Sequence, residues 1–178
     1  NFKTSSGLLL DNAGNFLAYP AGLDKDVVMP EGITVIADNA FADSNIRSIH
    51  IPASVTEIGA EAFKNTTNLR EVTFADNSQL SVIGDRAFQG SSLRKITIPA
   101  SVAKLGTPAP ENKGTTYYYK NTDLNKNGVF MDCDKLEEVV MLCNPTTIAQ
   151  GTFAGCSRLK TVTLPETMLE IPEFTFYN

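Results

Sequence analysis

Apolar residues recur along this chain at a spacing of about 23 positions. Six phenylalanines each follow an isoleucine or leucine by five residues, once 20 inserted residues are set aside in one copy. These phenylalanines are Phe41, Phe63, Phe88, Phe130, Phe153 and Phe176. A second apolar series follows them, as in Leu69-Arg-Glu-Val72-Thr-Phe74, where apolar and polar positions alternate. Alternation with a period of two predicts a short strand with one buried face in each copy.

The repeat divides most of the chain into six units. They span residues 29–50, 51–73, 74–97, 98–140, 141–163 and 164–178. Repeats of this length build solenoids, because a single unit cannot bury its apolar positions and must stack on its neighbours. We expect the strands of successive units to pair side by side. The last unit holds only 15 residues, so we also expect the chain to be part of a longer protein.

Residues 1–28 depart from the repeat and predict a cap for the N-terminal end of the stack. Two apolar runs, Gly7-Leu-Leu-Leu10 and Phe16-Leu-Ala-Tyr19, flank the turn-forming segment Asp11–Asn15, which is typical of a hairpin. Asp24–Val28 then matches the strand half of a repeat. We expect a single domain over residues 1–178, with 1–28 as its cap and 29–178 as its repeats.

Two departures inside the repeats predict local changes. Ala75 replaces the proline that follows the strand in most units, and two extra residues precede Ile83, so we expect an enlarged turn there. The larger departure is an insertion at 107–126, which contains three consecutive tyrosines, Tyr117–Tyr119. Long loops of this kind lie on the surface and often carry binding residues.

The segment Ile51-Pro-Ala-Ser-Val-Thr-Glu-Ile-Gly-Ala-Glu-Ala-Phe63, followed by Leu69-Arg-Glu-Val72, resembles the leucine-rich repeats of bacterial surface proteins called BspA-like or Treponema-type. The resemblance covers roughly residues 24–178, with six copies in register. It implies an α/β-type leucine-rich repeat solenoid, strand-dominated with little helix, in a right-handed stack of about six repeats. It also implies an exported bacterial protein, secreted or attached to the cell surface, that adheres to host extracellular-matrix proteins or to other cells.

Composition narrows the range of functions. The formal net charge of -5 disfavours nucleic acid as a partner, and no apolar run is long enough to span a membrane. The single histidine, His50, has no cysteine near it in the repeat register, so no catalytic triad is expected and we predict no enzyme activity. Cys133 and Cys156 occupy a position where other units have Ser or Thr, and we expect them to be buried free thiols.

Outward-facing positions of the predicted strands form three rows across the sheet. One row contains Val28, His50, Thr73, Thr97, Val140 and Thr163. A second contains Asp26, Ser48, Glu71, Lys95, Glu138 and Thr161. The third, at the strand entry, contains Lys25, Arg47, Arg70, Arg94, Glu137 and Lys160, of which five are basic. Such a basic row orients an acidic partner, or it only keeps an exposed sheet soluble.

One further pattern fits a cation site. Residues 123–134 match the spacing of a calcium loop, with oxygen ligands at Asp123, Asn125, Asn127 and Asp134. Only two of the four are charged, and no flanking helices are expected. The alternative is an Asn-Gly turn that closes the insertion.

These observations predict a non-catalytic, extracellular binding or adhesion module that recognises a protein partner on a host or cell surface. Its candidate contacts are Arg47, His50, Arg70, Glu71, Thr73, Arg94, Lys95, Thr97, Lys160 and Thr163 on the strands, and Tyr117, Tyr118 and Tyr119 in the loop. Two alternatives stay open: carbohydrate binding through the tyrosines, and a structural spacer. We expect no cofactor other than calcium, no nucleic-acid partner, no direct membrane insertion, and a monomer or weak end-to-end association.

Overall fold

The structure, a computed structural model, describes residues 3–5, 8–11, 13–19, 26–107 and 127–177. These residues form β-strands and turns, with no helix among them, which agrees with the prediction of a strand-dominated fold. The strands are β1 (Lys3–Ser5), β2 (Leu8–Leu10), β3 (Phe16–Ala18), β4 (Asp26–Val28), β5 (Val35–Ile36), β6 (Ser48–Ile51), β7 (Glu57–Ile58), β8 (Glu71–Phe74), β9 (Val82–Ile83), β10 (Lys95–Ile98), β11 (Lys104–Leu105), β12 (Glu138–Met141) and β13 (Thr161–Thr163).

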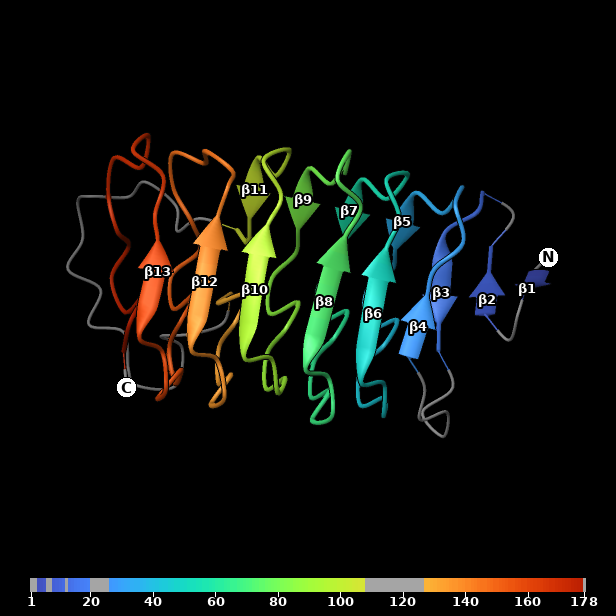
Figure 1. Cartoon of the computed structure of the whole chain (residues 1–178), viewed down its shortest axis with the longest axis horizontal. Helices are drawn as coiled ribbons and strands as arrows, with labels where there is room; N and C mark the ends of the chain where they lie inside the picture. The colour runs from blue at the N-terminus through green and yellow to red at the C-terminus, as the bar shows by residue number, and fades with distance from the viewer. Residues whose placement is uncertain (1–2, 6–7, 12, 20–25, 108–126, 178) are drawn as a thin grey trace, which may run out of the picture.

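The strands lie on two faces of an elongated stack (Figure 1). Nearest the viewer is a row formed by β4, β6, β8, β10, β12 and β13, which we call the strand face. Behind it lies a seven-stranded rear sheet in the order β1-β2-β3-β5-β7-β9-β11. The chain winds between the two faces, so the stack is a solenoid whose repeats pair with their neighbours in parallel.

A column of phenylalanine rings runs through the centre of the stack. The column joins Phe16 and the six predicted anchors, and consecutive ring centroids lie 4.6 to 5.8 Å apart. All rings except Phe176 are buried. The five-residue spacing from the preceding isoleucine or leucine therefore marked the core correctly in the first five units, which bury both positions, whereas Ile171 and Phe176 of the last unit are exposed.

The turns that hold this column require left-handed backbone at two positions in most repeats. Asn39, Glu61 and Arg86 lie two residues before a column phenylalanine and have φ between 55° and 59°. Asp43 and Asn65 lie two residues after one, with φ near 57°. Asn and Asp tolerate this conformation better than most residues, and glycine occupies the second position in other units, as at Gly90 and Gly155.

The predicted N-terminal hairpin is present. β2 and β3 pair antiparallel across the turn at 11–15, and β3 then pairs in parallel with β5, so the hairpin extends the rear sheet. β1 adds a further antiparallel strand that the sequence did not indicate. The half-repeat that follows is also present, because β4 pairs in register with β6.

The strand face is not one continuous sheet, which corrects the expectation that all successive strands pair. β4, β6 and β8 form one parallel sheet and β10, β12 and β13 another, and Figure 1 shows the wider gap between β8 and β10. The intervening unit differs from its neighbours at both turns. It has two extra residues before Ile83, and five residues from Phe88 to Leu93 where both flanking units have six. The ladder breaks at this unit, although β6 and β8 pair in register across a similar difference, with five residues from Phe41 to Ile46 and six from Phe63 to Leu69.

The predicted enlarged turn follows β8 directly. The amide of Ala75 donates to the carbonyl of Ile51 at 3.1 Å, a bond that the proline of other units cannot make. The amide of Ser78 closes the turn onto the carbonyl of Ala75 at 2.9 Å, and Leu80 is fully buried. The rear sheet is unaffected, because β7, β9 and β11 pair in register behind the gap.

Candidate binding face

The strand face presents the predicted rows of outward side chains in two blocks. In the first block, Val28 pairs with His50 and His50 with Thr73, while in the second Thr97 pairs with Val140 and Val140 with Thr163. The predicted second row divides in the same way, into Asp26, Ser48, Glu71 and then Lys95, Glu138, Thr161. The sequence therefore predicted the residues of each row correctly, except that neither row continues from β8 to β10.

Most charges on this face are neutralised by a neighbour in the next repeat. Lys95 Nζ lies 2.8 Å from Glu138 Oε1, and Lys160 Nζ lies 2.5 Å from Glu137 Oε2. The hydrogen bond from Lys160 and its positive charge hold the pKa of the Glu137 carboxyl below its usual value. Exposed ion pairs of this kind add little to the stability of the fold. Their main effect is on which charges of the strand face remain without a partner.

The entry row retains two basic residues without such a partner. Arg47 lies 3.8 Å from the carboxylate of Asp26. In contrast, no carboxylate of the described residues lies within 4.0 Å of the guanidinium of Arg70 or Arg94. Among the described members of the predicted basic row, Arg70 at the entry of β8 and Arg94 at the entry of β10 therefore make no close ion pair, and Lys25 lies outside the described residues.

His50 is an ordinary member of the strand face. Its Nδ1 lies 2.9 Å from Thr73 Oγ1 on the next strand, and the side chain is half-exposed. Within the described residues, no three His, Cys, Asp or Glu side chains gather closely enough to hold a metal ion. No helix of the described residues is long and apolar enough to cross a membrane.

Several predicted site residues lie outside the described residues. These are Tyr117, Tyr118 and Tyr119 of the loop, and Asp123 and Asn125 of the calcium pattern. Of the remaining calcium candidates, Asn127 is half-buried and Asp134 pairs with Lys135 at 2.6 Å. The tyrosine loop and the calcium site stay predictions.

The three cysteines are buried and free, as predicted for Cys133 and Cys156. Cys133 Sγ donates to the carbonyl of Phe88 at 3.0 Å, and Cys156 Sγ donates to the carbonyl of Phe130 at the same distance. Cys133 and Cys156 thus each bond to the unit before their own. Burial raises the pKa of Cys133 to about 12 and that of Cys143 to about 11.

These thiols are expected to be inert in the native protein. Because the thiolate is the reactive form and burial raises the pKa of all three, little thiolate forms near pH 8. A thiol reagent at pH 8 should label none of them rapidly in native protein and all three after unfolding in guanidinium chloride. Rapid labelling of a native cysteine, identified by mass spectrometry, would contradict the packing described above.

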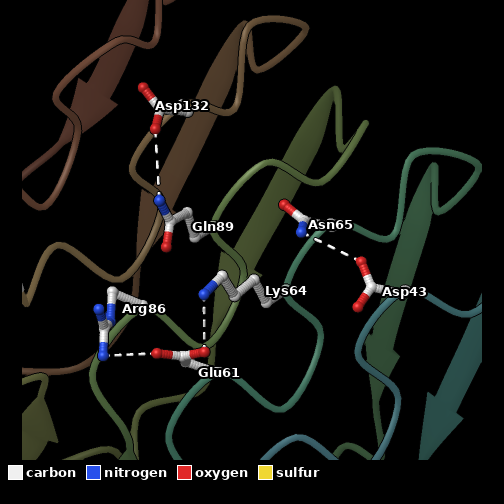
Figure 2. A network of polar contacts seen from close by, with 7 residues as sticks. All are labelled: Asp43, Glu61, Lys64, Asn65, Arg86, Gln89 and Asp132. Carbon is white, nitrogen blue, oxygen red and sulfur yellow. Dashed lines mark hydrogen bonds and ion pairs between the residues drawn. The ribbon is translucent and has the colours of Figure 1, made fainter.

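A polar network that the sequence did not indicate lies on the turns beside the phenylalanine column (Figure 2). Its centre is Glu61, whose Oε1 lies 2.5 Å from Arg86 Nη2 and whose Oε2 accepts a hydrogen bond from Lys64 at 2.8 Å. The hydrogen bond from Lys64 and the nearby charge of Arg86 hold the pKa of Glu61 below its usual value. Two cations surround this carboxylate, so it links one repeat to the next.

Side-chain amides extend the network along the stack. Asn65 Nδ2 donates to Asp43 Oδ1 at 3.1 Å, and Gln89 Nε2 donates to Asp132 Oδ2 at 3.4 Å (Figure 2). The recurrence of Asp, Asn or Gly two residues after each phenylalanine was the available sequence signal. Three of these contacts, Glu61–Arg86, Asn65–Asp43 and Gln89–Asp132, join neighbouring repeats, so the group connects the repeats and the strand face remains the better candidate for binding.

Comparison with known proteins agrees with this architecture. Residues 24–115 and 123–178 match the family described as BspA type Leucine rich repeat region, in six copies. No curated protein matches the chain.

Solved structures of bacterial proteins share the fold. The pneumococcal vaccine antigen PcpA has a TM-score of 0.71 and 19% identity, over 99% of this chain and 47% of the antigen. The leucine-rich repeat protein of T. pallidum has a TM-score of 0.55 and 23% identity, over 93% of this chain and 80% of that one. A leucine rich cell surface protein of Faecalibacterium prausnitzii A2-165 has a TM-score of 0.51 and 21% identity, over 93% of this chain and 55% of that protein. The chain thus spans about half the length of the pneumococcal antigen.

Proposed function

Because the chain belongs to the BspA-type leucine-rich repeat family, we propose that it is a non-catalytic module that binds a protein partner through its strand face. The observation that carries this proposal is the display of polar side chains in register on two parallel ladders. The ladders fix the backbone of the face, so the backbone loses little further freedom on binding. A face of this kind can contribute to an interface of standard size, about 1,600 Å² in total.

We place the module outside the cell, secreted or attached to a bacterial surface, with a host or cell-surface protein as its partner. The pneumococcal protein with this fold is described as a vaccine antigen, and the F. prausnitzii protein as a cell surface protein. The absence of a catalytic role is supported by the chemistry of the described residues. His50 bonds to a threonine, and the cysteines are buried with raised pKa values.

The proposal predicts that binding is sensitive to substitutions on the strand face and insensitive to matched ones on the rear sheet. The chain would be tested by biolayer interferometry against a panel of purified extracellular-matrix proteins and by attachment to epithelial cells. Three variants sample the face: His50→Glu, Arg70→Glu with Arg94→Glu, and Lys160→Glu with Thr163→Glu. At least one should weaken binding tenfold or more, because a charge reversal at the centre of an interface costs several kcal/mol.

The control is Lys104→Glu, which makes the same kind of charge change on the exposed side of β11 in the rear sheet. It should leave binding unchanged. Loss of binding with Lys104→Glu, or full binding by all three strand-face variants, would refute the proposal. Loss only when the tyrosines at 117–119 become alanine would favour the predicted loop site, and with it carbohydrate binding.

A further inference from the structure

The gap between β8 and β10 is a cleft in the strand face. Its volume is about 720 Å³, and the outward residues of both strands line it, including Glu71, Thr73, Lys95 and Thr97. The cleft lies where the parallel ladder stops, so the facing edges of β8 and β10 make no ladder hydrogen bonds with each other.

The entry end of the cleft carries two arginines that make no close ion pair among the described residues, although Glu71 also lines this end and Arg94 acts on the carboxylate of Glu137 through its charge. Arg70 and Arg94 both line it, and both are exposed. Neither lies within 4.0 Å of a carboxylate of the described residues, whereas Arg47, Lys95 and Lys160 each do. A guanidinium without a protein partner can bind a carboxylate through two parallel hydrogen bonds, so this end suits acidic side chains.

The exit end of the cleft holds its larger apolar side chains. Its lining there includes Phe74, Pro99 and Leu142, which is 55% exposed, together with the carboxylate of Asp76. Exposed large apolar side chains next to a cleft are typical of contact sites. From entry to exit the strands span four residues, or about 13 Å at 3.3 Å per residue. The cleft thus has its two arginines at one end and its larger apolar side chains at the other, over the length of a short extended peptide.

We propose that this cleft is the docking site for an extended, acidic segment of a protein partner. The segment lies along β8 and β10, with its acidic side chains on Arg70 and Arg94 and an apolar side chain against Leu142. Thr73 and Thr97 offer hydroxyl groups between the two ends. This inference rests on the proposed function and adds to it a location and a class of ligand.

The test uses two labelled hexapeptides, acetyl-Glu-Glu-Val-Thr-Val-Leu-amide and its reversed sequence, so that both strand directions are sampled. Fluorescence anisotropy with the complete chain should show saturable binding of at least one, weakening as salt is raised. Arg70→Glu with Arg94→Glu should weaken it tenfold or more. Thr97→Trp, which fills the cleft without changing charge, should do the same, and Lys104→Glu should have no effect. A peptide with lysine in place of glutamate should not bind.

Two results would overturn the cleft assignment. One is the absence of saturable binding by either peptide up to about 5 mM, a concentration above the weakest affinities of specific peptide sites. The other is binding that Arg70→Glu with Arg94→Glu leaves unchanged, with native circular dichroism confirming that each variant is folded. If a matrix protein loses binding with Lys160→Glu and Thr163→Glu but not with the cleft variants, the proposed function stands and the cleft assignment fails.

Discussion

Phe63→Ala should destabilise the protein by about 3–5 kcal/mol, the range for phenylalanine removed from a packed core. Phe63 is fully buried, and its ring stacks on Phe41 at 4.9 Å and on Phe88 at 5.0 Å. The substitution removes both ring contacts and leaves a cavity that the ladders on either side prevent from closing. Because small proteins have a total stability of about 5–15 kcal/mol, a loss of this size should lower the midpoint of unfolding strongly.

The matched control is Phe176→Ala at the end of the column. Phe176 is 46% exposed and has one ring neighbour in the column, Phe153 at 5.5 Å, so its removal should cost at most about 1.5 kcal/mol. Guanidinium unfolding followed by circular dichroism would measure both. Because units of a solenoid can unfold separately, the slope of the transition must also be compared with that of the unsubstituted chain. Equal losses for the two variants would show that the column does not hold the stack together.

The buried anchor positions of the fold were predictable because the same position is buried in successive units. Ile49, Val72, Ile96 and Val139 fill equivalent buried positions, and Ile49 pairs with Val72 and Ile96 with Val139 in the predicted register. Such positions repeat their residue type because stacked units share one core. The two-residue strands of the rear sheet were not predictable, because two residues are too short to show an alternation.

The position of the cleft could not be predicted from the equivalent positions of the repeat. Glu71 and Lys95 were assigned to one row because they occupy equivalent positions in successive units, yet Lys95 pairs with Glu138 on its other side. The break between β8 and β10 coincides with length changes in the turns before and after Phe88, and the near-constant repeat length conceals those opposing changes. Arg86 and Glu61 were missed for a related reason, since a charged residue with positive φ leaves little trace in one sequence.

Gly128→Ala should also destabilise the protein strongly, by about 3 kcal/mol, at the upper end of the usual cost of overpacking. A Cβ added at Gly128 would lie 2.0 Å from the carbonyl oxygen of Gly151 and 2.6 Å from its carbonyl carbon. Both are backbone atoms of the next unit, so no rotamer change relieves the clash. The hydrogen bond from the amide of Phe130 to the carbonyl of Thr152, 2.9 Å, holds the two units together at this point.

Gly32→Ala is a control that separates the cost of a steric clash from the cost of backbone strain. Gly32 has a φ of +92° and no atom within 4 Å of an added Cβ, so alanine there costs only conformational strain, about 1–2 kcal/mol. Gly128 is the reverse case. Its φ lies outside the left-handed region, but the space that a Cβ would need is occupied by the backbone of Gly151. Asn127-Gly128 therefore resembles a turn sequence, but the glycine is needed for the close approach of two units. Thermal unfolding in which Gly32→Ala costs more than Gly128→Ala would contradict this explanation.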